Sequence, residues 1–213
     1  MKIDVSSIES KLNEPFFAEF KKIAIKIINE YIKAIKKIDD SCLKKDIYTL
    51  EKNETQSFIN LYFHTITHSI KDENALQILD TLRHVFLSYA SNGLHQLYTR
   101  QENEGWYPKI ILTSILFPND IDSMDENLTL YRGCDISEFE NMTFGQAWTI
   151  LPSIAKAFAY DYYFDQSWFN IRKRAVLITN YSKEFVLFYE QSAEQEVVIN
   201  TSKLGLVKLM DDS

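Results

Sequence analysis

Two carboxylates near the end of the chain have the spacing of an acid–base pair. Glu194 and Glu196 flank Gln195, immediately before the apolar run 197–199. On a strand, side chains two residues apart point to the same face, and two carboxylates so close push their pKa values apart. One of them can then stay ionised beneath a developing cation while the other accepts a proton from a nucleophile. The alternative is a solvated start of a strand, to which Glu190 would add charge.

A single arginine ends an alternating run earlier in the chain. Arg132 follows the residues 128–131 (LTLY) and precedes Gly133. The two-residue period predicts a half-buried strand. A guanidinium at the edge of a strand can donate two hydrogen bonds to a phosphate or a carboxylate, and a glycine beside it lets a flat ligand approach the backbone. Taken alone, these residues favour a simpler interpretation, which is a surface arginine followed by a turn.

The order of the later motifs shifts that balance. Residues 145–149 (GQAWT) lead into residues 153–159 (SIAKAFA), and the Glu194-Gln195-Glu196 motif follows much later. An arginine on a first strand, a Ser/Thr-containing strand that leads into a helix, and a Glu-x-Glu at the start of a later strand resemble the ADP-ribosyltransferase family of the Arg–Ser–Glu type. The resemblance covers roughly the last 85 to 90 residues, a small single domain in size.

The resemblance implies mono-ADP-ribosyl transfer, with NAD as the substrate and nicotinamide as the leaving group, and it implies no metal. Breaking the bond between nicotinamide and ribose generates an oxocarbenium-like cation, so the site must stabilise positive charge and hold the pyrophosphate. By resemblance, Glu196 stabilises the cation, Glu194 activates the acceptor and Arg132 clamps the pyrophosphate. Gly133 would offer its backbone to the nicotinamide amide, and Thr149 would support the site.

Other NAD contacts are expected from the segment after the middle motif. An aromatic ring normally stacks on nicotinamide, and Tyr160, Tyr162 and Tyr163 are the candidates, with core packing as the alternative for each of them. The basic residues 172–174 (RKR) end an aromatic loop that begins near Asp161. They could reach the adenine-side phosphate or form a solvated cluster.

The middle motif departs from the family pattern, which usually has Ser-x-Ser or Ser-x-Thr. Ala147 occupies the position of the first hydroxyl, Trp148 is typical of a core residue, and Thr149 keeps the last hydroxyl. Losing such a supporting hydrogen bond often costs about one to two decades in activity. Either Thr149 or Gln146 orients the glutamate, or the substitution is inactivating. The alternatives to a transferase are therefore an NAD glycohydrolase and a degenerate, non-catalytic binding module.

The sequence does not decide whether the acceptor of ADP-ribose is a protein side chain or a nucleic acid. In the family, Glu-x-Glu tends toward arginine as the acceptor among protein-modifying members. The net charge of −7 speaks mildly against a nucleic acid, because binding one requires local cations. The family and the richness in Lys, Ile, Asn, Tyr and Phe favour a toxin or an effector of bacterial or phage conflict. The helical part would then recognise the target or an antidote protein.

Composition and patterning predict a soluble α+β protein. The chain has 46% hydrophobic and 25% charged residues and only five glycines, which is ordinary for a helix-rich globular protein. The pattern is helical before Asp120, and β-branched runs dominate after it. We therefore expect a helical region at 1–120 and an ADP-ribosyltransferase-like domain with a split β-sheet at 121–213.

The periodicity places the individual elements. We expect a helix start capped at Ser6-Ser7, a helix after Pro108 and a kink at Gly93. The expected helices are 15–38, 46–70, 75–101 and 152–163, and the expected strands are 128–134, 144–149, 175–179, 185–189, 196–199 and 205–209. Six lysines on the first long helix could bind a membrane surface or nucleic acid, but interspersed acidic residues favour a solvated face.

The remaining reactive residues are expected to be structural. Cys42 and Cys134 are far apart in the sequence and are expected to be thiols. His64 and His68 share a helix face, but Thr65 stands where a metalloprotease motif needs glutamate, which favours ordinary surface histidines. The sequence begins without the apolar run of a secretory signal and has no stretch of membrane-spanning length. We therefore expect a cytoplasmic protein with no membrane partner, which leaves delivery to a target cell open.

Overall fold

The computed structural model describes residues 2–42, 50–92 and 105–210. The chain divides into two compact units. The helical unit runs from Ile3 to Ile110, and the sheet unit comprises Met1–Lys2 and Ile111–Ser213. The division falls at Ile110, upstream of the change in composition near Asp120 where we expected it. Helices and strands are both abundant, which confirms the α+β class.

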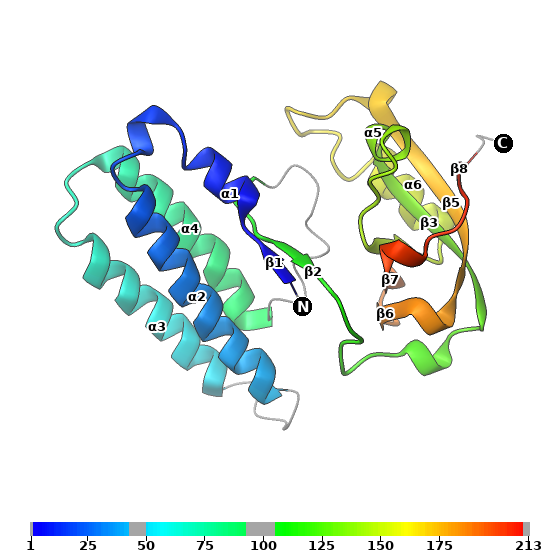
Figure 1. The fold of residues 1–213 in the computed structure, drawn as a ribbon, viewed down its shortest axis with the longest axis horizontal. Coiled ribbons are helices and arrows are strands. Elements are labelled where there is room, and N and C mark those ends of the chain that lie inside the picture. Colours follow the sequence, from blue (N-terminus) through cyan, green and yellow to red (C-terminus); the bar gives the residue numbers. More distant parts are fainter. Residues whose placement is uncertain (1, 43–49, 93–104, 211–213) are drawn as a thin grey trace. The chain divides into compact units, whose positions relative to one another are not determined.

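Three long helices form the core of the helical unit. They pack side by side after the short helix α1 (Ser6–Lys11) and the 3-10 turn η1 (Pro15–Phe17) (Figure 1). Their bounds are α2 (Lys21–Cys42), α3 (Leu50–Thr67) and α4 (Glu73–Asn92). Buried residues recur on α2 at the spacing of one helix face, namely Ala24, Ile27, Ile28, Tyr31 and Ile35.

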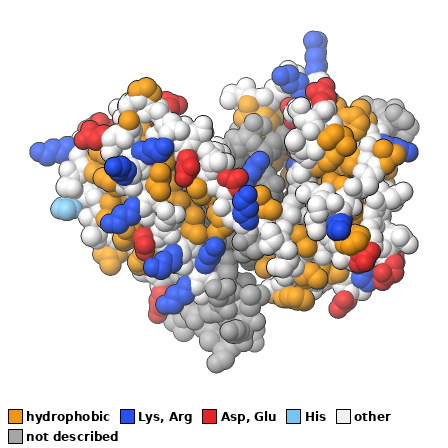
Figure 2. Space-filling model, in the orientation of Figure 1, with side chains coloured by type: hydrophobic (Ala, Val, Ile, Leu, Met, Phe, Trp, Pro, Cys, Tyr) orange, Lys and Arg blue, Asp and Glu red, His pale blue; other side chains and the backbone are white. Residues whose placement is uncertain are grey.

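The lysines of α2 lie on the face that points away from this core. Lys22, Lys26, Lys33, Lys36 and Lys37 are all exposed. Figure 2 shows Lys and Arg side chains (blue) on this unit scattered among uncharged and acidic ones. The solvated face that we expected is therefore present, since a long charged side chain keeps its head in water when its helix buries the opposite side.

Two expectations about this unit are wrong at its ends. Helix α1 begins at Ser6, with Val5 at the N-cap position and no side-chain cap. Instead, the Ser6 amide donates to Asp4 Oδ1 over 2.9 Å. The predicted helix after Pro108 is the strand β2 (Lys109–Ile111), which pairs with β1 (Lys2–Asp4). A short apolar run fits a strand and a helix equally by periodicity, which explains the error.

Other predictions for this region lie outside the described residues. They concern the helical segments 46–49 and 93–101 and the kink at Gly93. The described parts of the chain contain no helix with both the length and the apolar character needed to cross a membrane.

Tyr31 is buried at the centre of the helical unit. Its ring lies 5.6 Å from that of Phe86 and 6.4 Å from that of Tyr62, centroid to centroid. Its side chain is 0% exposed, and its hydroxyl has no hydrogen-bond partner in the described structure. Burial is the main cause that raises the pKa of Tyr31, so the hydroxyl stays protonated at any physiological pH.

We predict that Tyr31→Phe stabilises the protein. The substitution removes a buried hydroxyl that lost its water on folding and gained no partner, and this gain is about 1 kcal/mol. Urea unfolding measures it as a higher midpoint at unchanged slope. Tyr162→Phe, at a side chain that is 49% exposed, is the matched control and should change the midpoint little. A destabilised Tyr31→Phe variant would contradict the prediction.

The sheet unit is built on six antiparallel strands in the order β6-β7-β4-β3-β5-β8. All six predicted strands are present, and the predicted helix at 152–163 is α6. The strands are β3 (Asn127–Asp135), β4 (Ala147–Thr149), β5 (Arg174–Ser182), β6 (Val186–Tyr189), β7 (Glu196–Ile199) and β8 (Val207–Leu209). The helices are α5 (Ser137–Glu140) and α6 (Pro152–Tyr160), with 3-10 turns η3 (Ile121–Ser123), η4 (Ile171–Lys173), η5 (Lys183–Phe185) and η6 (Thr201–Lys203).

The sheet is continuous, which corrects the expected split into two sheets. Strands β3 and β5 pair over nine residue pairs, and β4 and β7 pair over three. Between them, β3 and β4 pair at Tyr131 with Thr149. We call this single pair the joint, because it connects the half β6-β7-β4 to the half β3-β5-β8.

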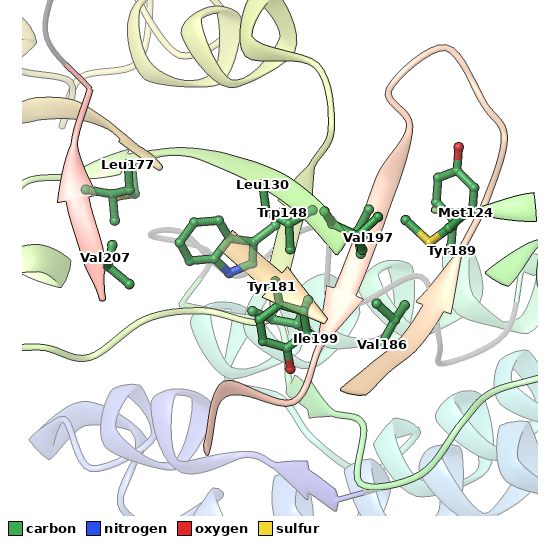
Figure 3. Packing of buried hydrophobic residues seen from close by; sticks show 12 residues of the cluster. Met124, Leu130, Trp148, Leu177, Tyr181, Val186, Tyr189, Val197, Ile199 and Val207 are labelled. Carbon is green, nitrogen blue, oxygen red and sulfur yellow. The ribbon is translucent and has the colours of Figure 1, made fainter. Parts of the chain in front are cut away.

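The main core of the sheet unit covers one face of the sheet. Trp148 is 2% exposed and its Nε1 donates to the Gly145 carbonyl over 3.0 Å, which confirms it as a core residue. Figure 3 shows Trp148 in the middle of the cluster, with Leu130, Tyr181 and Val197 beside it. On the other face, Ala155 and Ala159 of α6 pack on Val176 of β5.

Candidate active site

The register of three neighbouring strands places Tyr131, Thr149 and Glu196 in one row. Tyr131 of β3 pairs with Thr149 of β4, and Thr149 pairs with Glu196, the first residue of β7. Paired residues on antiparallel strands project to the same face of the sheet. Tyr131 packs against Ala155 and Ala159, so this row lies on the face that carries α6.

Glu196 is partly buried at the end of this row. Burial, followed by the negative charges of Glu194 and Glu190, raises its pKa to about 8, and the nearby Arg132 opposes the rise. A carboxylic acid with such a pKa is largely protonated at neutral pH. A positive charge placed beside it would stabilise its ionised form and lower its pKa. The arrangement therefore suits a group that meets a cationic ligand.

The turn before Glu196 has an unusual backbone. Gln195 has a φ of 46°, in the left-handed region that costs a non-glycine residue about 1 kcal/mol or more. Its amide N–H and its Nε2 both donate to the Ser192 carbonyl, and its Oε1 accepts from the Tyr189 hydroxyl. Glu194 therefore lies in a turn and not on the strand, so the expected alternation that would align Glu194 with Glu196 is wrong.

Thr149 holds this turn against the sheet. Its buried Oγ1 donates to the Glu194 carbonyl over 2.7 Å and accepts from the Leu151 amide over 3.0 Å. Gln146 is the other candidate for orienting the glutamate. Its Oε1 accepts from the Leu112 amide, and its Nε2 donates to the carbonyls of Leu112 and Ile199. Thr149 is thus connected to the motif of Glu194, whereas Gln146 fixes the far end of β7.

Arg132 follows Tyr131 on β3 and pairs with Leu177 of the main core, so its side chain starts from the face opposite to the row, and its guanidinium is already bound. Nε and Nη2 donate to the two carboxylate oxygens of Glu138 over 2.9 and 2.8 Å, and Nη1 donates to the Ala147 carbonyl over 2.6 Å. A Cβ on Gly145 would lie 2.5 Å from Nη2, so that glycine leaves room for the guanidinium. The expected clamp on a pyrophosphate is therefore occupied by a side chain of the same unit.

Glu138 is the residue that sequence reasoning missed. It lies on α5, directly after the strand that carries Arg132. The only available signal was an acidic residue in a short helix after a strand that ends on arginine, and this pattern alone is not specific.

Gly133 has a packing role in the structure. A Cβ at this position would lie 2.0 Å from the Ala155 carbonyl oxygen and 2.5 Å from the Ala159 amide nitrogen. Both atoms belong to the backbone of α6, so the missing side chain lets the helix lie directly on β3. A contact of the Gly133 backbone with nicotinamide stays a prediction.

The three candidate tyrosines do not gather at one place. Tyr160, the last residue of α6, packs against the small cluster of Ala155, Ala159 and Val176. Tyr162 is half exposed and lies edge-on to Phe158, and Tyr163 lies 5.2 Å from the ring of Trp168. Each tyrosine thus has its own packing partners, and Tyr162 is the one that leaves most of its surface to solvent.

The basic residues after the aromatic loop divide into two kinds. Arg174 is buried, donates to the carbonyls of Ala159 and Phe158 at the end of α6, and lies over the rings of Tyr163 and Phe169. It therefore caps the helix, which is a favourable place for a cation. Arg172 and Lys173 are exposed and stay candidates for a phosphate contact.

Residues elsewhere add no second chemical centre within the described chain. His64 packs edge-on to Phe63, and His68 Nδ1 lies 3.1 Å from the Thr65 carbonyl. Residues 2–42, 50–92 and 105–210 contain no group of three His, Cys, Asp or Glu side chains that could hold a metal. Cys134 is a buried thiol, and the side chain of Cys42 lies outside the described part. A hollow lined by 127–129 and 180–182 includes none of the predicted site residues.

The site is thus a row of side chains across an antiparallel sheet, with a glutamate of raised pKa at one end. A partly buried arginine–glutamate pair lies on the strand that begins the row and on the helix after it. Comparison with known proteins assigns no family to it, since no family model, no curated protein and no solved structure matches this chain.

Proposed function

We propose that the sheet unit is a mono-ADP-ribosyltransferase-like domain that transfers ADP-ribose from NAD to a macromolecular acceptor. One observation supports this proposal above the others. Strands β3, β4 and β7 are neighbours and carry Arg132, Thr149 and Glu196 in the order that the family resemblance requires, and β4 leads into α6. The sequence order of the three motifs thus corresponds to three adjacent strands, and this correspondence supports the proposal.

Glu196 stabilises the cation in the proposed reaction. The bond between nicotinamide and C1′ of the ribose breaks, and its electron pair leaves with nicotinamide, which becomes neutral. The positive charge on C1′ favours the ionised carboxylate, which lowers the pKa of Glu196 from its raised value in the free protein. The acceptor then bonds to C1′ and gives its proton to Glu194.

The other predicted residues support this step in different ways. Thr149 holds the turn that carries Glu194. Arg132 adds a positive charge on the phosphate side, and Gly133 contributes its backbone to nicotinamide binding. Of the three tyrosines, Tyr162 has the surface most open to a flat ring, and Tyr160 and Tyr163 complete the aromatic surroundings.

A non-catalytic binding module is the second candidate, and two observations favour it. Ala147 lacks the hydroxyl that the family usually has, and Glu138 occupies the bidentate edge of Arg132. In such a module the same fold would bind a partner without cleaving NAD. Hydrolysis of NAD, with water as the acceptor, is the third outcome.

One assay separates the three. The protein is incubated with NAD labelled in its adenylate part, with and without cell lysate, and the label is followed on protein, on nucleic acid and as free ADP-ribose. Transfer of label to a macromolecule supports the transferase, and its position identifies the acceptor. Free ADP-ribose alone supports hydrolysis, and uncleaved NAD supports the binding module.

The family resemblance extends the proposal to the cell. The protein acts as a toxin or a conflict effector in the cytoplasm of the cell that it affects, and an antidote or regulatory protein is expected as a partner. Its expression without that partner should slow growth, and the Glu196→Gln variant should not.

Ala147→Ser is predicted to raise the rate of NAD cleavage. Ala147 lies two residues before Thr149 on β4 and pairs with Val198, so its Cβ projects to the face of Glu196. It is a diagonal neighbour of Glu196, at about 7–8 Å, which a serine hydroxyl and a long glutamate side chain can bridge. We expect an increase in kcat of about tenfold. Ala147→Cys has nearly the same shape and a much weaker donor, and equal rates for the two variants would contradict the prediction.

A further inference from the structure

The joint between β3 and β4 is reinforced by a salt bridge that crosses it. Arg132 lies on β3, and its Nη1 donates to the carbonyl of Ala147 on β4. Glu138 accepts from Arg132 with both oxygens, and its Oε2 also accepts from the Gly145 amide over 3.1 Å. The pair thus joins α5, the end of β3 and the segment that enters β4.

Both partners are well shielded from water. Their side chains are 11% exposed for Arg132 and 19% exposed for Glu138. Charge-assisted bidentate hydrogen bonds of this kind have a fixed geometry and strengthen where water is excluded. The backbone ladder offers a single pair between β3 and β4, so the bonds of Arg132 and Glu138 add to core packing in fixing the distance between the two strands.

The position of β4 in turn sets the position of the proposed catalytic residues. Thr149 is the last residue of β4, pairs with Glu196 and donates to the Glu194 carbonyl. A displacement of β4 relative to β3 would therefore move Glu194 and Glu196 relative to β3 and Arg132. Such displacements are costly for catalysis even when they are small.

We propose that Glu138 is a positioning residue, which holds the Arg132 guanidinium in the joint and thereby fixes β4 and the turn that carries Glu194 and Glu196. Its part in catalysis rests on the proposed function. The opposing interpretation is that Glu138 is a plug that NAD displaces from Arg132. Displacement would leave a shielded carboxylate without its cation and the Gly145 amide without its acceptor, which favours the positioning role.

The test compares Glu138→Gln with Glu140→Gln, which makes the same charge change at an exposed residue of the same helix. For each variant, kcat and KM for NAD cleavage are measured separately, together with site-resolved amide hydrogen exchange. For Glu138→Gln we expect kcat to fall by about 10- to 100-fold, with little change in KM. We also expect faster exchange at residues 147–149 and 194–196, but not in β5 and β8. Glu140→Gln should resemble the wild type in both measurements.

Three results would overturn the inference. A lower KM in Glu138→Gln would support the plug, unchanged exchange around β4 would remove the positioning role, and faster exchange throughout the sheet unit would indicate general destabilisation. If Glu138→Gln does not fold, Glu138→Asp keeps the charge with a shorter reach and is judged by the same pattern. If the wild type does not cleave NAD, the proposed function fails, and the exchange pattern still decides what Glu138 holds in place.

Discussion

Replacing Glu196 with glutamine is expected to stop NAD cleavage and, at the same time, to make the protein more stable. The two effects share one cause. The site holds a carboxylate where burial and two acidic neighbours disfavour its charge, and a neutral amide of the same shape relieves that cost. The same amide cannot stabilise an oxocarbenium-like cation, so we expect cleavage to fall by at least about 100-fold.

The stabilisation has a defined pH dependence. The pKa of Glu196 is about 8 in the folded protein, whereas its ordinary value, which applies to the unfolded chain, is 4.5. The folded state therefore binds the proton more tightly than the unfolded state. Stability of the wild type therefore falls as the pH rises from 4.5 to 8, and the glutamine variant escapes this fall. The difference should be near zero at pH 4.5 and reach on the order of 2–4 kcal/mol above pH 8.

Thermal unfolding at pH 4.5 and at pH 8.5 measures this difference. Glu184→Gln makes the same charge change at an exposed residue of the sheet unit and is the matched control. A Glu196→Gln variant that is less stable than the wild type at pH 8.5 would show that the carboxylate is not held at a cost. Full NAD cleavage by that variant would show that Glu196 does not stabilise the cation.

Gly133→Ala is expected to destabilise the sheet unit severely. The added methyl group would lie 2.0 Å from the Ala155 carbonyl oxygen and 2.5 Å from the Ala159 amide nitrogen. Both are backbone atoms of α6, so no side-chain rotation can make room and the helix must move off β3. We expect a loss of about 3 kcal/mol or more.

Gly205→Ala is the control for this substitution. A Cβ at Gly205 would meet nothing within 4 Å, and neither glycine has a left-handed backbone. Gly205→Ala should therefore leave stability unchanged or raise it by about 0.4–1 kcal/mol. Urea unfolding and the yield of soluble protein compare the two variants. Equal stability would mean that α6 does not lie on β3 in the way described.

The sequence predicted the strands of the sheet unit well, because each of them has a clear local signal. The alternation at 128–131 and the apolar run at 197–199 lie within β3 and β7. The order of the motifs also predicted a joint role for Arg132, Thr149 and Glu196; they lie on adjacent strands, and the role itself stays a prediction. Local patterns failed at β2, where a short apolar run has no period long enough to separate strand from helix.

The properties of the candidate site that sequence could not predict depend on how the chain folds around each residue. The partner of Arg132 is determined by how α5 folds back after β3, and Glu138 has no motif that indicates it. The packing role of Gly133 depends on where α6 lies. The left-handed Gln195 depends on anchors at Ser192 and Tyr189. Each of these needs the tertiary arrangement, which residue types and spacing do not contain.

The joint makes the mechanical resistance of the sheet uneven across its strands. Three residue pairs connect β4 to β7 and nine connect β3 to β5, but a single pair connects the two halves. Under tension across the strands, the load at the joint would therefore fall on the bonds of Arg132 and Glu138 to the β4 side, while both halves keep their own ladders. The row from Tyr131 to Glu196 crosses this joint, so its resistance to force depends on two side chains more than on the backbone ladder.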